Sequence, residues 1–363
     1  MIGLHCGLDT TDLYAIRVAL SFSDSVSVPD DLMPAELSVT IIVPALNEEK
    51  YIREAIHSLL PRHEDIDYEL IVLDGGSTDR TSSIVEEMAA INPRIRLEKN
   101  PGRYQSAGIN RGAKLAKPES RIIIRADSHA EYPPDFVMGL ARELTHRNVA
   151  SIVVPMRTRG KGFLQRGIAA AQNSRLGNGG AAHRYLNSSG YVDHGHHAAF
   201  DRSVFLAVGG YDESFTHNED AELDIRLRNS GGQIWLCSEL AISYFPRNSI
   251  RALARQYFNH GSGRARTMLK HRNRPKVRQL LPLGAFGMNM LSLASGLGFG
   301  WPFFLPALVY AGACLTGGLI LASTKRDPAA CASGLAAIAM HQSWAAGFIY
   351  RIMRVSVSRA PAA

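Results

Sequence analysis

Cysteine is scarce in this sequence, and the four residues are widely spaced: Cys6, Cys237, Cys314 and Cys331. No C-x-x-C spacing occurs, which excludes a disulfide framework and a cysteine-built zinc site and indicates a reducing compartment. Charged residues are also few, at 20% against 46% hydrophobic residues. A chain of 363 residues with this composition is long enough for one large or two modest folded units and is not a disordered tail.

Acidic residues are absent from residues 251–278, which hold nine of the 40 Lys and Arg residues. This segment explains the net charge of +7, because 31 basic residues remain elsewhere against 33 acidic ones. A nucleic-acid-binding domain would spread its positive charge over a folded face. The surplus is instead one local feature, and we expect no nucleic-acid partner.

Charge of either sign is absent from residues 279–324, a stretch that can cross a bilayer twice at about 20 residues per span. A second uncharged stretch, residues 328–350, follows after Lys325, Arg326 and Asp327. The alternative is a buried helical core of a soluble domain. It is disfavoured because such helices carry a polar face and rarely run this long without charge. We expect membrane attachment.

The basic segment precedes the first span, where it fits the positive-inside rule and attraction to anionic headgroups. The amino-terminal mass is then expected at the cytoplasmic face. Three spans would put Arg351, Arg354 and Arg359 outside, against that rule. Two spans, with residues 281–300 in the membrane interface, would keep them inside. Residues 1–37 are expected to form a loose leader without a targeting signal.

From Val39 onward, short apolar runs alternate with helical patterns, as in an α/β unit with a mainly parallel sheet. Pro44 is expected to stop the first strand and Pro61 the first helix. The predicted strands are Val39–Val43, Glu69–Leu73, Arg94–Leu97 and Arg121–Ala126, and the predicted helices are Glu48–Leu60, Asp79–Ala90 and Tyr104–Leu115.

Polar residues follow the clearest of these strands. In open α/β sheets, ligands bind at the carboxyl ends of strands. We therefore expect these residues to line one crevice: Asn47, Glu48, Asp74 and Asp127. An Asp at the position of Asp127 can hold a divalent cation that bridges two phosphates and neutralises a diphosphate leaving group.

A nucleotide suits this crevice. The carboxylate of Asp74 can accept from a base N–H or a ribose hydroxyl, and Gly75 and Gly76 let the backbone approach the ligand. The alternative is a plain strand-to-helix turn in which Ser77 or Thr78 caps the next helix.

Five short motifs occur in a fixed order along residues 38–265. They are Pro44-Ala45-Leu46-Asn47-Glu48, Asp74-Gly75-Gly76-Ser77-Thr78-Asp79, Ala126-Asp127-Ser128-His129, Val208-Gly209-Gly210-Tyr211-Asp212 and Glu219-Asp220. Each is a common string, but in this order and spacing they resemble the family 2 glycosyltransferases. The resemblance implies a GT-A fold with a Rossmann-like mixed sheet, a nucleotide-sugar donor, a divalent metal ion and inversion at the anomeric carbon.

Within that family the sequence is most similar to the membrane-attached glucosyltransferases of succinoglycan-type exopolysaccharide synthesis, which carry Arg-x-Asp-x-His where other members carry Asp-x-Asp. Here Arg125 replaces one carboxylate, so Asp127, with His129, is expected to position Mg²⁺ or Mn²⁺. The similarity implies UDP-glucose as donor and a lipid-linked oligosaccharide at the cytoplasmic membrane as acceptor. The donor-binding residues that it implies are Pro44, Asn47, Glu48, Asp74, Gly75, Arg125 and Arg264.

Displacement at a sugar C1 requires a base that removes the acceptor hydroxyl proton. The family pattern places that base on Asp220, with Glu219 orienting the acceptor or tuning Asp220 by like-charge repulsion. The alternative is a helix amino terminus, where adjacent acids favour the dipole without a catalytic role. Together with the upstream motifs, the catalytic interpretation is preferred.

Histidines cluster in the segment His194-Gly195-His196-His197, which invites a zinc interpretation. Neither a cysteine nor an H-E-x-x-H helix supports zinc, and the resemblance places this segment under the acceptor. His197, with Ala198, is therefore expected to line the sugar site.

Gln256 and Arg264 lie where membrane-bound relatives carry a Gln- and Arg-containing signature near the donor diphosphate. We expect Arg264 to clamp phosphate and Gln256 to contact the acceptor. A lipid-facing amphipathic helix is the alternative. The Trp of the processive Q-x-x-R-W motif is absent, which favours addition of a single sugar.

The sequence thus predicts an inverting glycosyltransferase with four segments: a leader (1–37), a GT-A domain (38–250, with a nucleotide-binding half 38–145 and an acceptor half 146–250), a basic juxtamembrane segment (251–278), and membrane helices with a tail (279–363). A non-catalytic membrane scaffold is disfavoured, because it would not need Asp74, Asp127 and Asp220 together. A dinucleotide-dependent oxidoreductase is disfavoured because no G-x-G-x-x-G follows the first strand.

Overall fold

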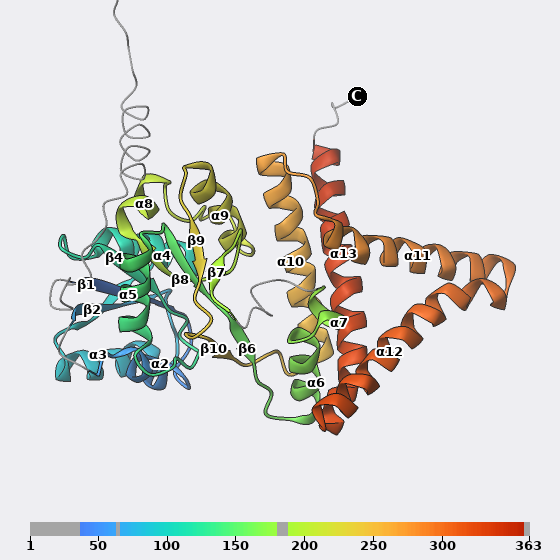
Figure 1. Cartoon of the computed structure of the whole chain (residues 1–363), viewed down its shortest axis with the longest axis horizontal. Helices are drawn as coiled ribbons and strands as arrows, with labels where there is room; N and C mark the ends of the chain where they lie inside the picture. Colours follow the sequence, from blue (N-terminus) through green and yellow to red (C-terminus); the bar gives the residue numbers. More distant parts are fainter. Residues whose placement is uncertain (1–36, 63–65, 180–187, 359–363) are drawn as a thin grey trace, which may run out of the picture. The chain divides into compact units, whose positions relative to one another are not determined.

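A computed structural model describes residues 37–62, 66–179 and 188–358 of the chain (Figure 1). The predicted leader lies outside the described residues except for its last position. The chain forms two compact units. The first comprises Met1–Pro155, Asn187–Ser214 and Glu222–Ala241, and the second comprises Met156–Leu186, Phe215–Ala221 and Ile242–Ala363. The predicted segment boundaries remain a prediction.

The first unit is built on an eight-stranded mixed sheet with the order β3-β2-β1-β4-β8-β5-β9-β7. The first four strands along the chain are parallel, whereas β8 runs antiparallel to both β4 and β5. The strands are β1 Ser38–Ala45, β2 Asp67–Asp74, β3 Ile95–Lys99, β4 Ile122–Arg125, β5 Ser151–Val154, β7 Gly190–Tyr191, β8 His196–Asp201 and β9 Ile234–Leu236.

Helices cover this sheet because their apolar faces pack against its strands. α4 packs on β1 and β2, α3 on β3, and α5 on β5 and β8. The core between them contains the side chains of Ile42, Ile71, Ile109, Ile123 and Phe200, all buried. The helices of this unit are α2 Ile52–Leu59, α3 Thr81–Ile91, α4 Gln105–Leu115, α5 Phe136–Arg147, α8 Arg202–Ala207 and most of α9 Glu219–Asn229.

The predicted strands and helices of residues 39–126 are confirmed, with ends shifted by a few residues. β1 does not stop before Pro44 but continues to Ala45. The Ile42 carbonyl accepts a hydrogen bond from the Ala126 N–H, on the β4 side of β1. The Ala45 carbonyl accepts one from the Gly75 N–H, on the β2 side. Backbone groups alternate along a strand, so Pro44 faces the β4 side, where β4 has already ended and no ladder bond is lost.

The second unit is mainly helical. A short parallel pair, β6 Met156–Thr158 with β10 Ile242–Tyr244, precedes helices that surround a small apolar cluster of Ile168, Leu253 and Met340. The helices are α6 Phe163–Gln172, α7 Arg175–Asn178, α10 Ile250–His271, α11 Val277–Phe299, η3 Trp301–Phe304, α12 Leu305–Lys325, η4 Pro328–Ala332 and α13 Ser333–Ser358.

Glycines allow α10 and α13 to pack closely. A Cβ at Gly261 would clash with the backbone carbonyl of Trp344, and a Cβ at Gly347 would clash with that of Phe258. α10 precedes the apolar pair α11 and α12, and α13 follows it. The two helices that flank the apolar pair are thus in direct contact with each other.

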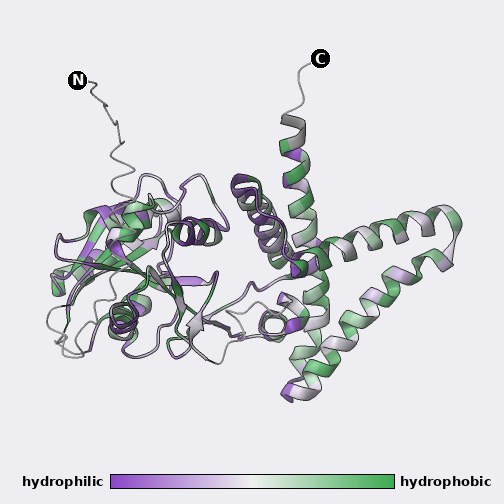
Figure 2. Cartoon of the chain, turned by 45° about the horizontal axis from the view of Figure 1, so that its top comes forward, coloured by the Kyte–Doolittle hydropathy of each residue, from purple (hydrophilic) through white to green (hydrophobic). Residues whose placement is uncertain are grey.

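Two helical segments are long and apolar enough to cross a membrane: Val277–Phe299 and Trp301–Lys325. Only 17% and 11% of the residues in the most apolar part of these two segments are buried. The core helices of a soluble domain would be mostly buried. Figure 2 shows these helices as largely hydrophobic and α10 as largely hydrophilic. The uncharged stretch 328–350, expected as a possible span, forms η4 and most of α13, which pack against α6, α10 and α12.

Candidate active site

The loops after β1 and β2 are tied together by Asn47. Its side-chain oxygen accepts hydrogen bonds from the Thr78 N–H (2.8 Å) and hydroxyl (3.3 Å), and its own N–H donates to the Ser77 hydroxyl at 2.9 Å. Asn47 also adopts a left-handed backbone conformation, φ 58°, which Asn tolerates better than most residues. Asn47 therefore holds the loops after β1 and β2 together.

Asp74 ends β2 and organises the turn that follows it. Its carboxylate accepts from the Ser77 hydroxyl (2.5 Å) and from the N–H groups of Ser77 and Gly76. Ser77 thus bonds back to Asp74 rather than capping α3, whose N-cap, Arg80, makes no side-chain cap bond. A Cβ at Gly75 would lie 2.8 Å from the Arg103 carbonyl, so glycine is required where the loops after β2 and β3 meet.

Pro44 and Glu48 complete the edge at β1. The Pro44 ring packs against Gly108 of α4, where a Cβ would meet it at 3.1 Å. The Glu48 carboxylate lies 3.0 Å from Nδ1 of His129, whose side chain is 48% exposed. His129, expected beside the metal, is therefore paired with Glu48 in this structure.

Asp127 follows β4, and its side chain is 15% exposed. Its Oδ1 accepts from Gln105 Nε2 at 2.5 Å and lies 3.6 Å from the Arg125 guanidinium. Its Oδ2 lies 3.6 Å from Nε2 of His196, the first residue of β8. The Tyr132 hydroxyl bonds the backbone N–H and carbonyl of Asp127 and fixes the main chain. One carboxylate oxygen is thus held by protein donors while the other faces an imidazole.

A buried chain of polar contacts extends from Arg125 toward α9. The Arg125 guanidinium donates to the Tyr211 hydroxyl at 3.1 Å, and that hydroxyl lies 2.7 Å from Nδ1 of His197. Nε2 of His197 lies 2.7 Å from the Asp224 carboxylate, which also accepts from His194 at 2.6 Å. Burial acts to raise the pKa of Asp224, but attraction to His197 and hydrogen bonds from both imidazoles outweigh it and hold the pKa below its usual range.

His197 is 1% exposed, so its side chain is enclosed by protein. This placement differs from the predicted contact with the acceptor sugar. The reason is the antiparallel pairing of β8, which directs His197 into the interior between Tyr211 and Asp224.

The Gly209-Gly210 turn places Tyr211 in this row of polar contacts. Both glycines have positive φ, 85° and 65°, and a Cβ at Gly210 would clash with the Asn110 side chain. The Asn110 amide then bonds the Tyr211 N–H and carbonyl, each at 2.8 Å. The two glycines of this motif therefore have a structural role, whereas Tyr211 takes part in the polar contacts between Arg125 and His197.

Glu219 and Asp220, the acidic residues predicted to act as orienting group and catalytic base, begin α9, and both are half-buried. Residues just before the pair are held by α10 within the second unit. Asn218 donates to the Thr267 hydroxyl at 3.1 Å, and a Cβ at Gly263 would lie 2.6 Å from the His217 carbonyl. Burial, and secondarily the charge of Arg247, lower the pKa of His217.

Gln256 and Arg264 both lie on α10 and are half-buried. Gln256 donates to the Tyr244 hydroxyl at 3.3 Å. The structure therefore gathers the predicted donor and metal residues of the first unit around the carboxyl ends of β1, β2 and β4. Glu219, Asp220, Gln256 and Arg264 belong to the second unit.

Four residues that contact the predicted residues of the candidate site were not predicted from the sequence: Gln105, His196, Tyr211 and Asp224. A signal existed for Gln105, a polar residue at the start of a helix that follows the third predicted strand. His196 and Tyr211 stood in segments already singled out by their sequence. The burial of Asp224 had no sequence signal, because Glu and Asp recur along the whole of residues 219–224.

The donor atoms near Asp127 fit a divalent cation that is shared with a substrate. Among the described residues, no group of three or more His, Cys, Asp or Glu side chains is placed to hold a metal ion. Mg²⁺ and similar ions are commonly bound by one or two carboxylates, with phosphates and water as the remaining ligands. Oδ2 of Asp127 and Nε2 of His196, 3.6 Å apart, can supply the protein part of such a site.

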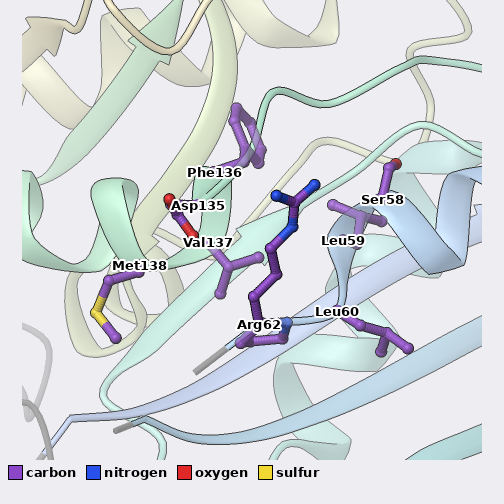
Figure 3. Close-up of a pocket in the computed structure, with 9 residues that line it drawn as sticks. Ser58, Leu59, Leu60, Arg62, Asp135, Phe136, Val137 and Met138 are labelled. Carbon is purple, nitrogen blue, oxygen red and sulfur yellow. The ribbon is translucent and has the colours of Figure 1, made fainter. Parts of the chain in front are cut away.

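A pocket elsewhere in the first unit is lined by the end of α2 and the start of α5 (Figure 3). It includes Leu59, Arg62, Phe136 and Met138. None of the predicted site residues lines it, so it carries no part of the candidate site.

Comparison with known proteins is consistent across sequence and fold. The family model described as glycosyl transferase family 2 matches residues 40–209. The chain is 41% identical over 315 residues to the succinoglycan biosynthesis protein ExoA of Rhizobium meliloti (strain 1021), covering 86% of this chain and 94% of that protein. It is 22% identical over 271 residues to a dolichyl N-acetyl-alpha-D-glucosaminyl phosphate 3-beta-D-2,3-diacetamido-2,3-dideoxy-beta-D-glucuronosyltransferase of Methanococcus voltae, covering 71% and 82%.

Among solved structures, the fold is similar to that of the mannosyltransferase PcManGT from Pyrobaculum calidifontis, solved in complex with GDP-Man and Mn²⁺. The TM-score is 0.58 at 18% identity, with 95% of each chain covered. This likeness confirms the predicted GT-A-like mixed α/β fold.

Proposed function

The chain belongs to glycosyltransferase family 2, and from that premise we propose that it transfers one glucose residue from UDP-glucose to a lipid-linked oligosaccharide, with inversion and formation of a β-linkage. The pathway we propose is the synthesis of a succinoglycan-type exopolysaccharide. The 41% identity to a succinoglycan biosynthesis protein supports this assignment, because it extends over 94% of that relative.

The observation that carries the proposal is the setting of Asp127. One of its carboxylate oxygens is held by Gln105, and the other faces His196 at 3.6 Å. We propose that Asp127 and His196 hold Mg²⁺ or Mn²⁺ together with the donor diphosphate, whereas His129 pairs with Glu48. When bound, the cation supplies positive charge that neutralises the leaving diphosphate.

Other donor contacts are proposed for the loops around Asp127. Asp74 and Gly75 are proposed to bind the base or ribose of the nucleotide, because they lie at the carboxyl end of β2. Asn47 holds the opposite loop in place through Thr78. On α10, Arg264 is proposed to contact phosphate and Gln256 the acceptor.

The proposed chemical step is a single displacement. The acceptor hydroxyl oxygen forms a bond to C1 of the sugar as the bond between C1 and the diphosphate oxygen breaks, and the hydroxyl proton passes to a carboxylate of Asp220. The bonding electrons leave with the nucleoside diphosphate. Glu219, beside the base, orients the acceptor hydroxyl.

We propose that α11 and α12 anchor the enzyme as a hairpin with both ends at the cytoplasmic face. The contact between α10 and α13 supports this orientation, because it brings together the helix that precedes the hairpin and the helix that follows it. The basic residues 251–278 then lie on the same side as Arg351 and Arg354, in agreement with the positive-inside rule.

A donor screen on membranes that contain the full chain tests this function. Radiolabelled UDP-glucose, UDP-galactose, GDP-mannose and UDP-N-acetylglucosamine would each be offered with a lipid extract from a polysaccharide-producing bacterium. We expect label from UDP-glucose in the lipid fraction, lost in the Asp127→Ala variant. Transfer from a different donor alone would contradict glucose, and no transfer from any donor would contradict the assignment.

A further inference from the structure

Arg351, on α13 of the second unit, lies beside other positive charges. It is half-buried, and its Nε donates to the hydroxyl of Ser262 on α10 at 3.3 Å. Arg354 follows it by three residues and lies on the same face of α13. The pKa of the Arg351 guanidinium is below its usual range, first because of burial and then because of the charges of Arg266 and Arg354. No Asp or Glu of the described residues is among the groups that shift this pKa.

The close packing of α10 and α13 holds these arginines together. Gly261 of α10 and Gly347 of α13 each lie against the backbone of the other helix, where a Cβ would clash. The Arg266 guanidinium stacks on the ring of Phe215, with Cζ 4.0 Å from the ring centroid. The two helices therefore cannot move apart to relieve the repulsion without losing close-packed contacts.

Acidic residues are absent from both helices. Neither Ile250–His271 nor Ser333–Ser358 contains Asp or Glu, and Asp327 is the only acidic residue of the chain after Glu239. Asp327 is paired with Arg166 of α6, through hydrogen bonds of 3.1 and 2.6 Å. A concentration of positive charge on helices without acidic residues attracts anions from solution or from a membrane.

The contact of α13 with α11 places this charge beside a candidate membrane span. α11 packs against α13, and Figure 1 shows it starting beside the carboxyl-terminal half of α13, which carries Arg351 and Arg354. Val277, the first residue of α11, is 77% exposed. A span that starts there enters the headgroup region, where lipid phosphates lie. The anion most readily available to these arginines is therefore a lipid phosphate.

We propose that Arg351 and Arg354, supported by the charge of Arg266, bind the phosphate groups that link the acceptor oligosaccharide to its lipid. This proposal rests on the lipid-linked acceptor of the proposed function. Arginine binds phosphate oxygens through paired N–H donors. A diphosphate offers more charge and more oxygen atoms than the phosphodiester of a bulk phospholipid, so two guanidiniums on one helix face favour the diphosphate.

α10 connects this phosphate site to the proposed base. Thr267, the residue after Arg266, accepts a hydrogen bond of 3.1 Å from Asn218, which lies two residues before Asp220. All of these residues belong to the second unit. One acceptor molecule would thus place its phosphates on α10 and α13 and its reacting hydroxyl at the start of α9.

The test is binding of farnesyl diphosphate, a short lipid diphosphate, to the purified full-length chain in detergent, with saturating UDP and Mg²⁺ to occupy the donor site. We expect the double variant Arg351→Gln/Arg354→Gln to bind farnesyl diphosphate about tenfold more weakly than the unmodified chain. The matched control is Arg251→Gln/Arg255→Gln, which removes the same charge from exposed positions of α10. The control should change the affinity by less than about twofold. Equal losses in the two double variants would overturn the proposal, because they would show attraction to overall charge alone.

A single variant guards against loss of fold. Arg354→Gln changes an exposed side chain, and we expect an approximately threefold loss of affinity with an unchanged melting temperature. Farnesyl diphosphate should raise the melting temperature of the unmodified chain more than that of this variant. An unchanged affinity in Arg354→Gln would overturn the proposal.

Two further measurements separate the phosphate site from bulk lipid binding and from the proposed function. Weaker binding of Arg351→Gln/Arg354→Gln to phosphatidylglycerol vesicles, with unchanged affinity for farnesyl diphosphate, would overturn the proposal. In the transfer assay, the same variant should raise the KM for the lipid acceptor and leave the KM for UDP-glucose unchanged. Absence of transfer by the unmodified chain would instead contradict the proposed function, whereas weaker farnesyl diphosphate binding by the double variant would still support the phosphate site.

Discussion

His196 stands opposite Asp127 because β8 runs antiparallel to β4. Ile124 pairs with Ala199, and continuation of that register places Asp127, two residues after the end of β4, beside His196, the first residue of β8. The result is the 3.6 Å separation between Asp127 Oδ2 and His196 Nε2. An imidazole far away in the sequence thus faces the proposed metal carboxylate.

The two candidate histidine ligands can be separated by substitution. We expect His196→Gln to weaken Mn²⁺ binding in the presence of UDP by at least about tenfold, because it removes the imidazole nitrogen that faces Asp127. His129→Gln, whose histidine is paired with Glu48, should change affinity by less than about threefold. Titration calorimetry with Mn²⁺ measures both. The opposite ranking would restore His129 as the ligand.

Neighbouring glycines in the Gly209-Gly210 turn are expected to differ in their tolerance of a side chain. Gly209→Ala meets no atom within 4 Å and suffers only backbone strain, of about 1 kcal/mol. Gly210→Ala adds a clash with Asn110, and we expect a loss of roughly 2–4 kcal/mol. Thermal unfolding of the detergent-solubilised chain compares them. Equal melting temperatures would show that the contact with Asn110 relaxes freely.

Membrane attachment by α11 and α12 predicts resistance to salt. The protein should stay with membranes in 1 M NaCl, which screens the basic residues to a Debye length of about 3 Å but leaves apolar insertion intact. Extraction by salt alone would show that charge is the whole attachment. A fluorescent reporter fused after residue 363 should lie on the same side as a tag placed near Asn273. Placement of the two on opposite sides would contradict the hairpin.

Acid should loosen the segment that precedes the proposed base. The pKa of His217 is lowered by burial and by Arg247, so the folded state disfavours the charged imidazole. The associated stability is fully present above the unfolded pKa of about 6.5 and is lost as pH falls through the lower folded value. The melting temperature should therefore drop between pH 7.5 and 5, and drop less in His217→Gln. An equal drop in both would assign the effect to other groups.

Much of the first unit could be predicted because local pattern and fold agree there. Val39–Val43 and Glu69–Leu73 are buried apolar strands that end in polar residues, and the structure confirms both. Residues 328–350 could not be assigned in this way. A buried helix of a helical unit and a membrane span are both uncharged, so the absence of charge does not distinguish them.

The site was predictable only where its residues follow strands in the chain. Asp74 and Asp127 were predicted in that way, and the structure places them at the ends of β2 and β4. His196 and Asp224 depend on β8 entering the sheet antiparallel and on α9 packing behind it, which are pairings between distant segments that no local pattern encodes. His197 could be recognised as a polar residue in an apolar strand, but its burial depends on the same pairings.

Removal of the Asp127 carboxylate should separate folding from catalysis. We expect Asp127→Ala to abolish measurable transfer and Mn²⁺ binding, since no second carboxylate stands at the position of Arg125. The melting temperature should fall by only a few degrees, because the Asp127 side chain is partly exposed and its backbone contacts with Tyr132 remain. Full turnover in excess chelator would remove the cation from the mechanism.

The role of Asp220 as the catalytic base is tested by the transfer rate of Asp220→Asn beside that of Glu219→Gln. Asn caps a helix as well as Asp does but cannot take the acceptor proton. We expect unchanged UDP binding and a loss in transfer of about a hundredfold or more for Asp220→Asn, with a smaller loss for Glu219→Gln. Near-normal transfer by folded Asp220→Asn would contradict it.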